Sequence, residues 1–348
     1  MNFKSLSTAM LLGTVVLSGC STENEPADAP VAGNVISFAA VTPKPTRSAP
    51  TTTASMQEFV VYAFTNSLTL MDGVTVKRSG GSWTYSPEAY WPSSPVNFFA
   101  FSPDITKSSS VSIVGGASGG HISGFLNDGT VDLLYSVNMQ VSQQAAPVIL
   151  NFRHAMSKVT AMLSSNNSNI EVKVVHVSLK NIYRQGSFDF PDATTAATTP
   201  DVKGTWKDLQ KPNGMLMFYA MSADDMVTLT STPTDYSLNN LDASYVIPQP
   251  LEKVVLNDGT YSGTFLQVDC EIFDKASGVK IWPTTQTPDY LLVPETNYGR
   301  LIYSLDTATV TQWESGHAYV YNISIDNPDV LDKIEFDVSV DDYAMEGM

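Results

Sequence analysis

The stretch Ile334-Glu-Phe-Asp-Val-Ser-Val-Asp341 alternates apolar and polar residues without interruption. Because successive side chains of a β-strand point to opposite faces of a sheet, this alternation predicts a half-buried strand. Its buried face would carry the four apolar residues of the stretch: Ile334, Phe336, Val338 and Val340. Residues 59–64, 172–179 and 319–325 alternate in the same way, and no segment has a long apolar period of 3.6 residues. The sequence therefore predicts an all-β chain.

Turn-forming residues separate the alternating runs, as at Asp72-Gly73, Asn127-Asp128-Gly129 and Asn257-Asp258-Gly259. Short strands joined by such turns usually close a core as β-sandwiches, with two sheets packed face to face. The chain has 348 residues, which is enough for about two domains at roughly 100–200 residues each. We therefore expect two sandwich domains in tandem.

The N-terminus has the features of a bacterial lipoprotein signal. Lys4 precedes an apolar run over residues 9–17, and small residues lead to the junction in Leu17-Ser-Gly-Cys20. The apolar run is too short to span a bilayer as a helix. We expect residues 1–19 to be removed as a signal peptide and Cys20 to carry fatty acyl chains such as palmitate, which anchor the protein to the outer membrane. The alternative is an ordinary secretory signal with an incidental cysteine.

Composition narrows the possible partners. Removal of Lys4 with the signal leaves 18 Lys and Arg against 35 Asp and Glu, a net charge of −17. This charge repels nucleic acids and anionic membrane surfaces. Residues 20–34 are polar and rich in Pro and Ala, which is typical of a flexible tether. Cys270 is then the one cysteine outside the anchor, so no internal disulfide can form, and we interpret Cys270 as a small buried hydrophobic residue.

Several short motifs, in their order along the chain, resemble the fimbrillins of type V pili, also known as Mfa-like lipoproteins. They are Tyr90-Trp-Pro92, Val96-Asn-Phe-Phe-Ala-Phe-Ser-Pro103, Asp132-Leu-Leu-Tyr135, Leu150-Asn-Phe-Arg-His-Ala-Met-Ser-Lys-Val159, Gly186-Ser-Phe-Asp-Phe190, Val246-Ile-Pro-Gln249, and Trp313 with Gly316, Tyr319 and Tyr321. The resemblance implies two tandem transthyretin-like β-sandwich domains. We place them at residues 35–145 and 146–348, with the junction near Ala145.

The resemblance also implies assembly by strand exchange, in which a protease removes the N-terminal strand and a strand of another subunit fills the groove. Residues 34–41 are the candidate removable strand, with Ile36, Phe38 and Ala40 on one face. Residues 42–53 contain three prolines and predict an exposed linker. Cleavage in this linker would free residues 20–47 with the lipid, including the candidate removable strand and linker at residues 35–47.

A trypsin-like protease would cut this linker between Arg47 and Ser48, because Lys44 is followed by proline and should resist cleavage. The alternative is that Arg47 is simply a solvated linker residue.

The C-terminal stretch is the candidate donor strand, with Ile334, Phe336, Val338 and Val340 as its anchors. The alternative is that it pairs within its own domain with residues 319–325, after a turn at Asn327-Pro-Asp329. The strand can also pair within its own domain first and complete another subunit afterwards. A strand that completes a neighbour makes a head-to-tail contact, which builds a filament because it does not close.

The resemblance therefore predicts a structural and adhesive subunit of a surface fimbria. Its partners would be other fimbrillin subunits, the outer membrane before processing, and a host or bacterial surface ligand. We predict no enzyme, no cofactor and no metal, because the sequence lacks a His-Glu-x-x-His motif and a phosphate-binding loop and its histidines are isolated. His154 is interpreted as a structural residue at a strand crossing.

The competing function is a non-polymerising surface lipoprotein that binds glycans. Four aromatic residues close together in sequence are candidates for an exposed binding platform: Trp83, Tyr85, Tyr90 and Trp91. The neighbouring Pro87 and Pro92 favour packing at a strand edge instead.

Overall fold

A computed structural model describes residues 34–41, 55–108, 111–116, 119–212, 214–221, 226–237, 244–327 and 336–342, the last segment with its backbone and the side chains of residues 339 and 340. Within these ranges the chain is built of β-strands and a 3-10 helix, η3 (Asp289–Leu291). The prediction of an all-β chain is confirmed. Among the same residues, no helix is both long and apolar enough to cross a membrane.

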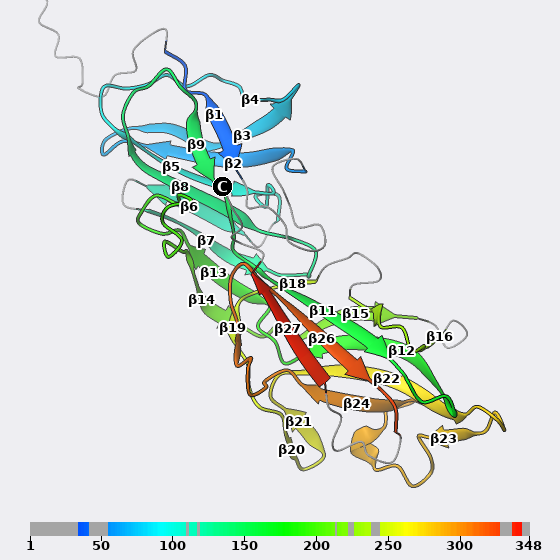
Figure 1. Ribbon diagram of the computed structural model, residues 1–348. Coiled ribbons are helices and arrows are strands. Elements are labelled where there is room, and N and C mark those ends of the chain that lie inside the picture. Colours follow the sequence, from blue (N-terminus) through cyan, green and yellow to red (C-terminus); the bar gives the residue numbers. More distant parts are fainter. Residues whose placement is uncertain are drawn as a thin grey trace, which may run out of the picture.

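The N-terminal half is built around a six-stranded sheet with the order β10-β8-β5-β2-β3-β4 (Figure 1). Its strands are β2 (Glu58–Phe64), β3 (Thr69–Ser79), β4 (Ser82–Thr84), β5 (Val96–Ser102), β8 (Leu134–Val141) and β10 (Arg153–His154). A four-stranded sheet, β14-β13-β7-β6, and a parallel pair, β1-β9, complete this half. Their strands are β1 (Phe38–Val41), β6 (Ser112–Gly116), β7 (Gly119–Leu126), β9 (Val148–Asn151), β13 (Gln185–Asp189) and β14 (Thr205–Gln210).

Strand β5 shows how these layers stack. All seven of its residues are buried, a pattern typical of a strand that is covered on both faces. Phe99 and Phe101 pack in the core shared with the four-stranded sheet, whereas Phe98 and Ala100 pack in the core shared with β1 and β9. The six-stranded sheet is therefore the middle layer of three.

The C-terminal half has two main sheets. One has the order β17-β11-β26-β27, with β18 also on β11. Its strands are β11 (Ser157–Ser164), β17 (Thr234–Asp235), β18 (Ser244–Val246), β26 (His317–Ser324) and β27 (Phe336–Asp342). The other has the order β15-β12-β22-β23, with β16 on β12 and β24 on β22. Its strands are β12 (Ile170–Lys180), β15 (Met215–Ala220), β16 (Val227–Thr228), β22 (Phe265–Asp274), β23 (Lys280–Trp282) and β24 (Gly299–Ser304).

Side chains of both sheets share one core, which includes Val159 of β11, Val174 of β12 and Tyr321 of β26. Cys270 lies in this core and is fully buried, and burial raises the pKa of its thiol. Two small pairs complete the half, β19 (Gln249–Pro250) with β25 (Gln312–Trp313) and β20 (Val255–Asn257) with β21 (Thr260–Ser262).

The sheets do not divide at Ala145, where we expected the junction. Beyond that residue, β9 pairs with β1, β10 pairs with β8, and β13 pairs with β7. The chain crosses to the C-terminal half between His154 and Ser157, then returns to the N-terminal half for β13 and β14. This return depends on pairing between distant segments, which local sequence patterns do not reveal.

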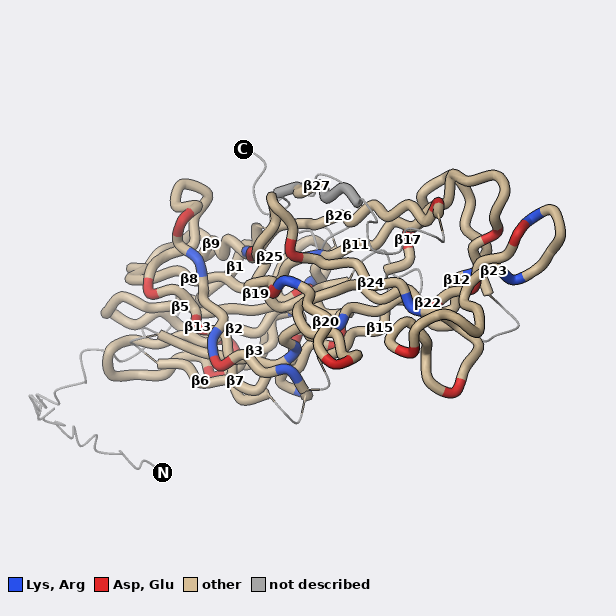
Figure 2. Tube along the Cα trace, turned by 90° about the horizontal axis from the view of Figure 1, so that it is seen from below, with Lys and Arg blue, Asp and Glu red and all other residues tan. Residues whose placement is uncertain are grey.

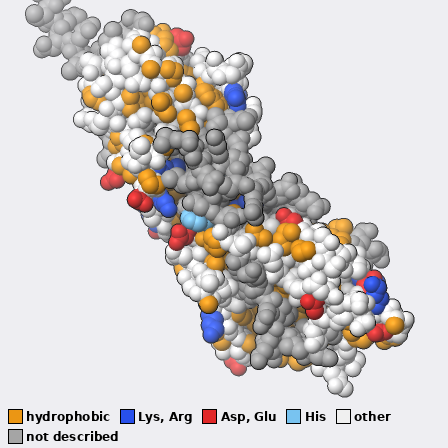
Figure 3. Space-filling model, viewed as in Figure 1, with side chains coloured by type: hydrophobic (Ala, Val, Ile, Leu, Met, Phe, Trp, Pro, Cys, Tyr) orange, Lys and Arg blue, Asp and Glu red, His pale blue; other side chains and the backbone are white. Residues whose placement is uncertain are grey.

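The two halves lie end to end in an elongated molecule (Figure 1). Acidic residues are distributed along both halves (Figure 2), in keeping with a net charge of −16 for the whole chain. On the face shown in Figure 3, hydrophobic side chains gather over the N-terminal half.

Candidate functional site

The first described segment, residues 34–41, lies in a groove of the N-terminal half and is bonded to β9 on one edge and, over residues 34–36, to residues 85–91 on the other. On one edge β1 pairs in parallel with β9, in a register that places Phe38 opposite Val148. The amide of Val148 donates to the Ser37 carbonyl at 2.7 Å, and the amide of Phe152 donates to the Val41 carbonyl at 2.7 Å.

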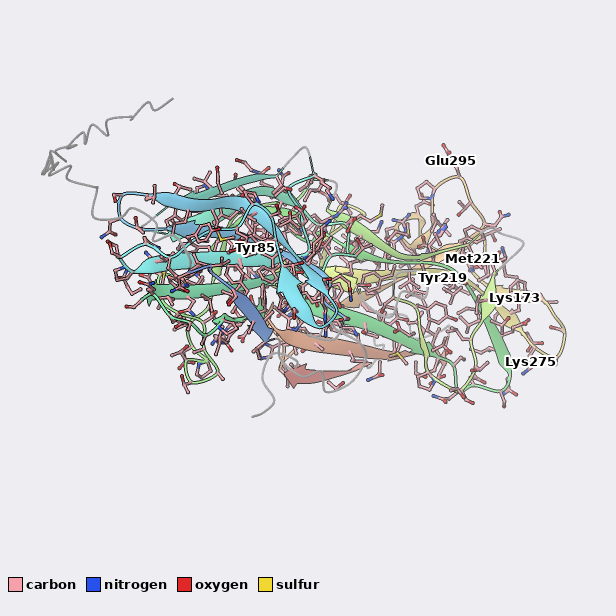
Figure 4. All side chains as sticks on the ribbon, turned by 90° about the horizontal axis from the view of Figure 1, so that it is seen from above. Tyr85, Lys173, Tyr219, Met221, Lys275 and Glu295 are labelled. Atoms are coloured by element: carbon pink, nitrogen blue, oxygen red, sulfur yellow. The ribbon has the colours of Figure 1, made fainter. Side chains whose placement is uncertain are left out.

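The opposite edge of the segment is held by residues 85–91. The Ile36 amide donates to the Ala89 carbonyl at 2.9 Å, and the Trp91 amide donates to the Asn34 carbonyl at 3.0 Å. The Tyr85 hydroxyl, which is labelled in Figure 4, donates to the Ile36 carbonyl at 2.6 Å. The segment is therefore bonded to residues 85–91 at its start, through Asn34 and Ile36, and to β9 along the rest of its length.

The side chains of the segment alternate between the groove and the surface. Ile36, Phe38 and Ala40 are 0%, 5% and 8% exposed, whereas Val35 and Val41 are 36% and 47% exposed. The three buried residues pack with β2, β5 and β9 in a single core. These are the three residues that the sequence assigned to the groove face.

Phe38 is the central contact of the groove. Its ring meets those of Phe59 and Phe98 edge to face, each at 5.8 Å between centroids, and that of Tyr85 at 5.7 Å. Such aromatic pairs add about 0.5–1.5 kcal/mol each beyond the area they bury. The groove is therefore shaped for an aromatic side chain at this position.

The four aromatic residues considered for a glycan platform belong to this groove region instead. Trp91 is 1% exposed and meets Phe98 at 5.9 Å. Trp83 packs on Phe59 at 5.0 Å, and Tyr85 is bonded to the segment. Tyr90 is half-buried and forms an isolated bridge with Val35. These rings line and flank the groove, so they do not form an open platform.

The C-terminal strand β27 pairs antiparallel with β26, with Val340 opposite Tyr319 and Val338 opposite Tyr321. This is the own-domain pairing that we considered as the alternative to donation. Val340, predicted on a buried face, is 45% exposed, because β27 is the edge strand of its sheet. The side chains of Phe336 and Val338 and the whole of Ile334 lie outside the described part of the structure.

The predicted lipidation and processing residues, Cys20, Arg47 and Ser48, also lie outside the described residues. The structure does show the two described residues on either side of the predicted cut. The groove segment ends at Val41, and the described chain resumes at Ser55, just before β2.

His154 lies where the chain crosses from one half to the other. Its Nδ1 lies 2.8 Å from Oδ1 of Asp132, and both side chains are buried. Tyr245 of β18 also bonds the Asp132 carboxylate, and burial together with Asp132 raises the pKa of this tyrosine. The neighbouring Arg153 donates to four backbone carbonyls, those of Ala196, Thr199, Pro200 and Val202. The roles of His154 and Arg153 in these contacts are therefore structural.

A cavity of about 410 Å³ lies beside the start of β2 and is lined by residues 55–58, Ser102, Pro103, residues 130–132 and Tyr245. Its carboxylates are those of Glu58 and Asp132, and Asp132 is bonded to His154 and Tyr245. In the parts of the chain that the structure describes, no group of three or more His, Cys, Asp or Glu side chains could hold a metal.

Comparison with known proteins assigns the family. A fimbrillin-like family model matches residues 46–342, so the chain belongs to the fimbrillin-like family. Its proteins are structural and adhesive, not enzymatic. A search of curated protein sequences found no match.

Solved structures place the chain in the same fold. A fimbrial protein from Bacteroides vulgatus is similar to it with a TM-score of 0.62 and 14% identity, over 89% of this chain and 99% of that one. The fimbrilin FimA from Porphyromonas gingivalis matches with a TM-score of 0.45 and 12% identity, over 88% of this chain and 96% of that one. The similarity to the Bacteroides vulgatus protein shows that the two chains share a fold. The fimbrillin resemblance predicted from the sequence is confirmed by the family match.

Proposed function

We propose that this protein is a fimbrial subunit of the type V pilus, exported as a lipoprotein acylated at Cys20 and assembled by β-strand exchange. Its two halves then correspond to transthyretin-like sandwich domains. The observation that carries the proposal is the groove segment, residues 34–41, which pairs with β9 and buries the side chains of Ile36, Phe38 and Ala40 yet precedes the predicted cut at Arg47.

Cleavage at Arg47 would separate the segment from the rest of the chain and leave it held by non-covalent contacts alone. Its departure would expose the aromatic rings around Phe38 and the unpaired backbone of β9 and residues 89–91. A groove of this kind is refilled favourably by any extended segment that supplies main-chain bonds and alternating apolar side chains.

The C-terminal strand of a second copy has a matching sequence. The groove segment reads Ile36-Ser-Phe-Ala-Ala40, and the C-terminal stretch reads Ile334-Glu-Phe-Asp-Val338. Both place isoleucine and phenylalanine two residues apart, followed by an aliphatic residue two positions later. We infer a register in which Phe336 of the donor takes the place of Phe38.

The position of β27 suits a donor. It pairs with β26 along one edge and is the outermost strand of its sheet, so it can leave without breaking a second ladder. The donor strand lies in the C-terminal half and ends near the middle of the molecule, whereas the groove lies in the N-terminal half, so the two are different surfaces of the subunit (Figure 1). The contact between copies is therefore head-to-tail and extends into a filament.

The test is to express Arg47→Ala beside Lys44→Ala in cells that assemble the polymer, and to follow subunit mass and high-molecular-weight ladders on gels. We expect Arg47→Ala to remain unprocessed and monomeric, whereas Lys44→Ala should process and polymerise like the parent because Pro45 protects that bond. Normal ladders from Arg47→Ala would contradict the proposed processing site.

A further inference from the structure

The outer face of the C-terminal sheet carries a charged row across three neighbouring strands. The register places His176 of β12 opposite Asp269 of β22, and Asp269 opposite Arg300 of β24. Their neighbours along each strand, such as Val177 and Leu301, point into the core. The row therefore faces away from the core, and Lys180 lies further along the same face of β12.

The carboxylate in this row bonds its nearest neighbours. Oδ1 of Asp269 accepts from the Gln267 amide at 2.7 Å, and Oδ2 lies 3.4 Å from Nδ1 of His176. The Asp269 side chain is 7% exposed. Burial raises its pKa, which Gln267, His176, Arg300 and Lys180 partly oppose.

The two basic side chains beside Asp269, those of Lys180 and Arg300, have no partner of opposite charge at salt-bridge distance among the described residues. Within the described part of the chain, neither Lys180 nor Arg300 forms a salt bridge within 4.0 Å. The Lys180 ammonium contacts Sδ of Met215 at 2.8 Å, and the buried Nε of Arg300 has no hydrogen-bond partner. Burial also lowers the pKa of Lys180.

The surplus of positive charge is local. One row further along the sheet, Lys280 pairs with Glu271 at 3.0 Å and Lys173 pairs with Glu171 at 3.5 Å, so these charges are balanced. Lys180 and Arg300 face one carboxylate, in a chain whose net charge is −16. Adjacent strands lie about 4.8 Å apart, so β12 and β24 are separated by about 10 Å, and Lys180 lies four residues beyond His176, about 13 Å further along the strand. Both side chains are long, and the charges of Lys180 and Arg300 both act on the Asp269 carboxylate, so their charged ends approach the same part of this face.

We propose that this face binds an acidic saccharide, with a sugar carboxylate between Lys180 and Arg300 and ring hydroxyls on His176, whose side chain is 31% exposed. The face offers donors and acceptors of mixed kinds, which sugar hydroxyls require. The central residues of a protein interface are usually aromatic or apolar and depleted of charge, unlike this row. The net charge of the chain repels nucleic acid. The inference is independent of strand exchange.

The experiment is titration calorimetry of the full chain at low salt with trigalacturonate, compared with galactotriose, which lacks the carboxylates. We expect binding of the acidic trisaccharide and none of the neutral one. The double variant Lys180→Gln/Arg300→Gln should lose at least about tenfold in affinity, the loss of charge-assisted bonds to one anion.

The matched control is Lys253→Gln/Lys275→Gln, which removes the same charge from two exposed lysines of the same half. Lys275 is labelled near the far end of this half in Figure 4. It should bind like the parent, as should Lys180→Arg/Arg300→Lys, which keeps both charges. An equal loss in the control, equal binding of galactotriose, or tighter binding of an oligoglutamate peptide than of trigalacturonate would overturn the proposal. Thermal unfolding of each variant shows that it is folded.

Discussion

Phe38 concentrates the aromatic contacts of the groove segment. It is 5% exposed and meets three rings, those of Phe59, Phe98 and Tyr85, within 6 Å between centroids. The neighbouring Ile36 and Ala40 are smaller and fill the same core on either side. The strength with which the groove holds any strand therefore depends mainly on the residue at this position.

Phe38→Ala should lower the free energy of unfolding by about 3–5 kcal/mol, because it removes a buried ring and leaves a cavity between Phe59 and Phe98. The matched control is Val41→Ala in the same strand, which is 47% exposed and should change stability by less than about 0.5 kcal/mol. Denaturant unfolding of the unprocessed protein measures both. Equal effects of the two changes would show that the ring does not hold the segment.

Asp132 and His154 join two sequence motifs that lie 22 residues apart. The pair is buried where the chain crosses between halves, and Tyr245 adds a contact from the C-terminal half. Asp132→Ala should destabilise the fold by about 3 kcal/mol, because it leaves His154 and Tyr245 buried without this carboxylate. Asp192→Ala, at an exposed position, is the control and should be near neutral in the same thermal unfolding assay.

The raised pKa of Asp269 gives stability a predictable dependence on pH. Burial raises this pKa above 3.8 in the folded state, so the unfolded state loses its proton first as pH rises. Stability therefore falls as pH rises from about 3.8 through the folded pKa, and the loss persists at neutral pH. The Asp269→Asn variant has no ionisable group at this position. Its free energy of unfolding relative to that of the parent should therefore rise as pH rises from about 3.8 through the folded pKa of Asp269. A difference that is constant between pH 3 and pH 7 would contradict this.

At the scale of elements, the groove segment and β27 are complementary. The first buries three apolar side chains in its groove, and the second is an edge strand with an exposed Val340. The free energy of exchange is then the difference between two strand–groove pairings, so a stable filament requires the donor to bind the groove more tightly than it pairs with β26.

A peptide of residues 332–342 should bind the protein after cleavage at Arg47 and removal of the freed segment. Replacing Phe336 by Ser in the peptide should weaken binding at least about tenfold, because the inferred register places this ring among those that surround Phe38. Asp341→Ser, on the polar face, is the control and should have little effect. Fluorescence polarisation measures both, and equal affinities for the two variants would exclude the register.

Local patterns predicted the elements of this fold better than their pairing. The alternation in residues 34–41 anticipated that Ile36, Phe38 and Ala40 are buried, because strand periodicity depends on neighbouring residues. The parallel pairing of β1 with β9 joins segments more than 100 residues apart. Likewise, nothing in the local sequence shows that β13 returns to β7, or that β27 leaves Val340 exposed. These features depend on which strands become neighbours.

At the scale of the whole molecule, the fold places the two parts that we propose for strand exchange in different halves. The groove lies in the N-terminal half, and the edge strand β27 lies in the C-terminal half and ends near the middle of the molecule (Figure 1). The contacts of Arg153, His154 and Tyr245 hold the crossing between the halves. In the assembly that we propose, the head-to-tail contact extends into a filament, because a contact between two different surfaces stays open unless its rotation closes a ring.

The central claim is that the groove segment is removed and replaced by a strand of another subunit. The most direct test is intact mass and N-terminal sequencing of the protein sheared from native cells, beside the membrane-retained fraction. If strand exchange builds the polymer, we expect a mature start at Ser48 in high-molecular-weight polymers and acylated Cys20 in the membrane fraction. Protein that starts at acylated Cys20 in both fractions and remains monomeric would contradict it.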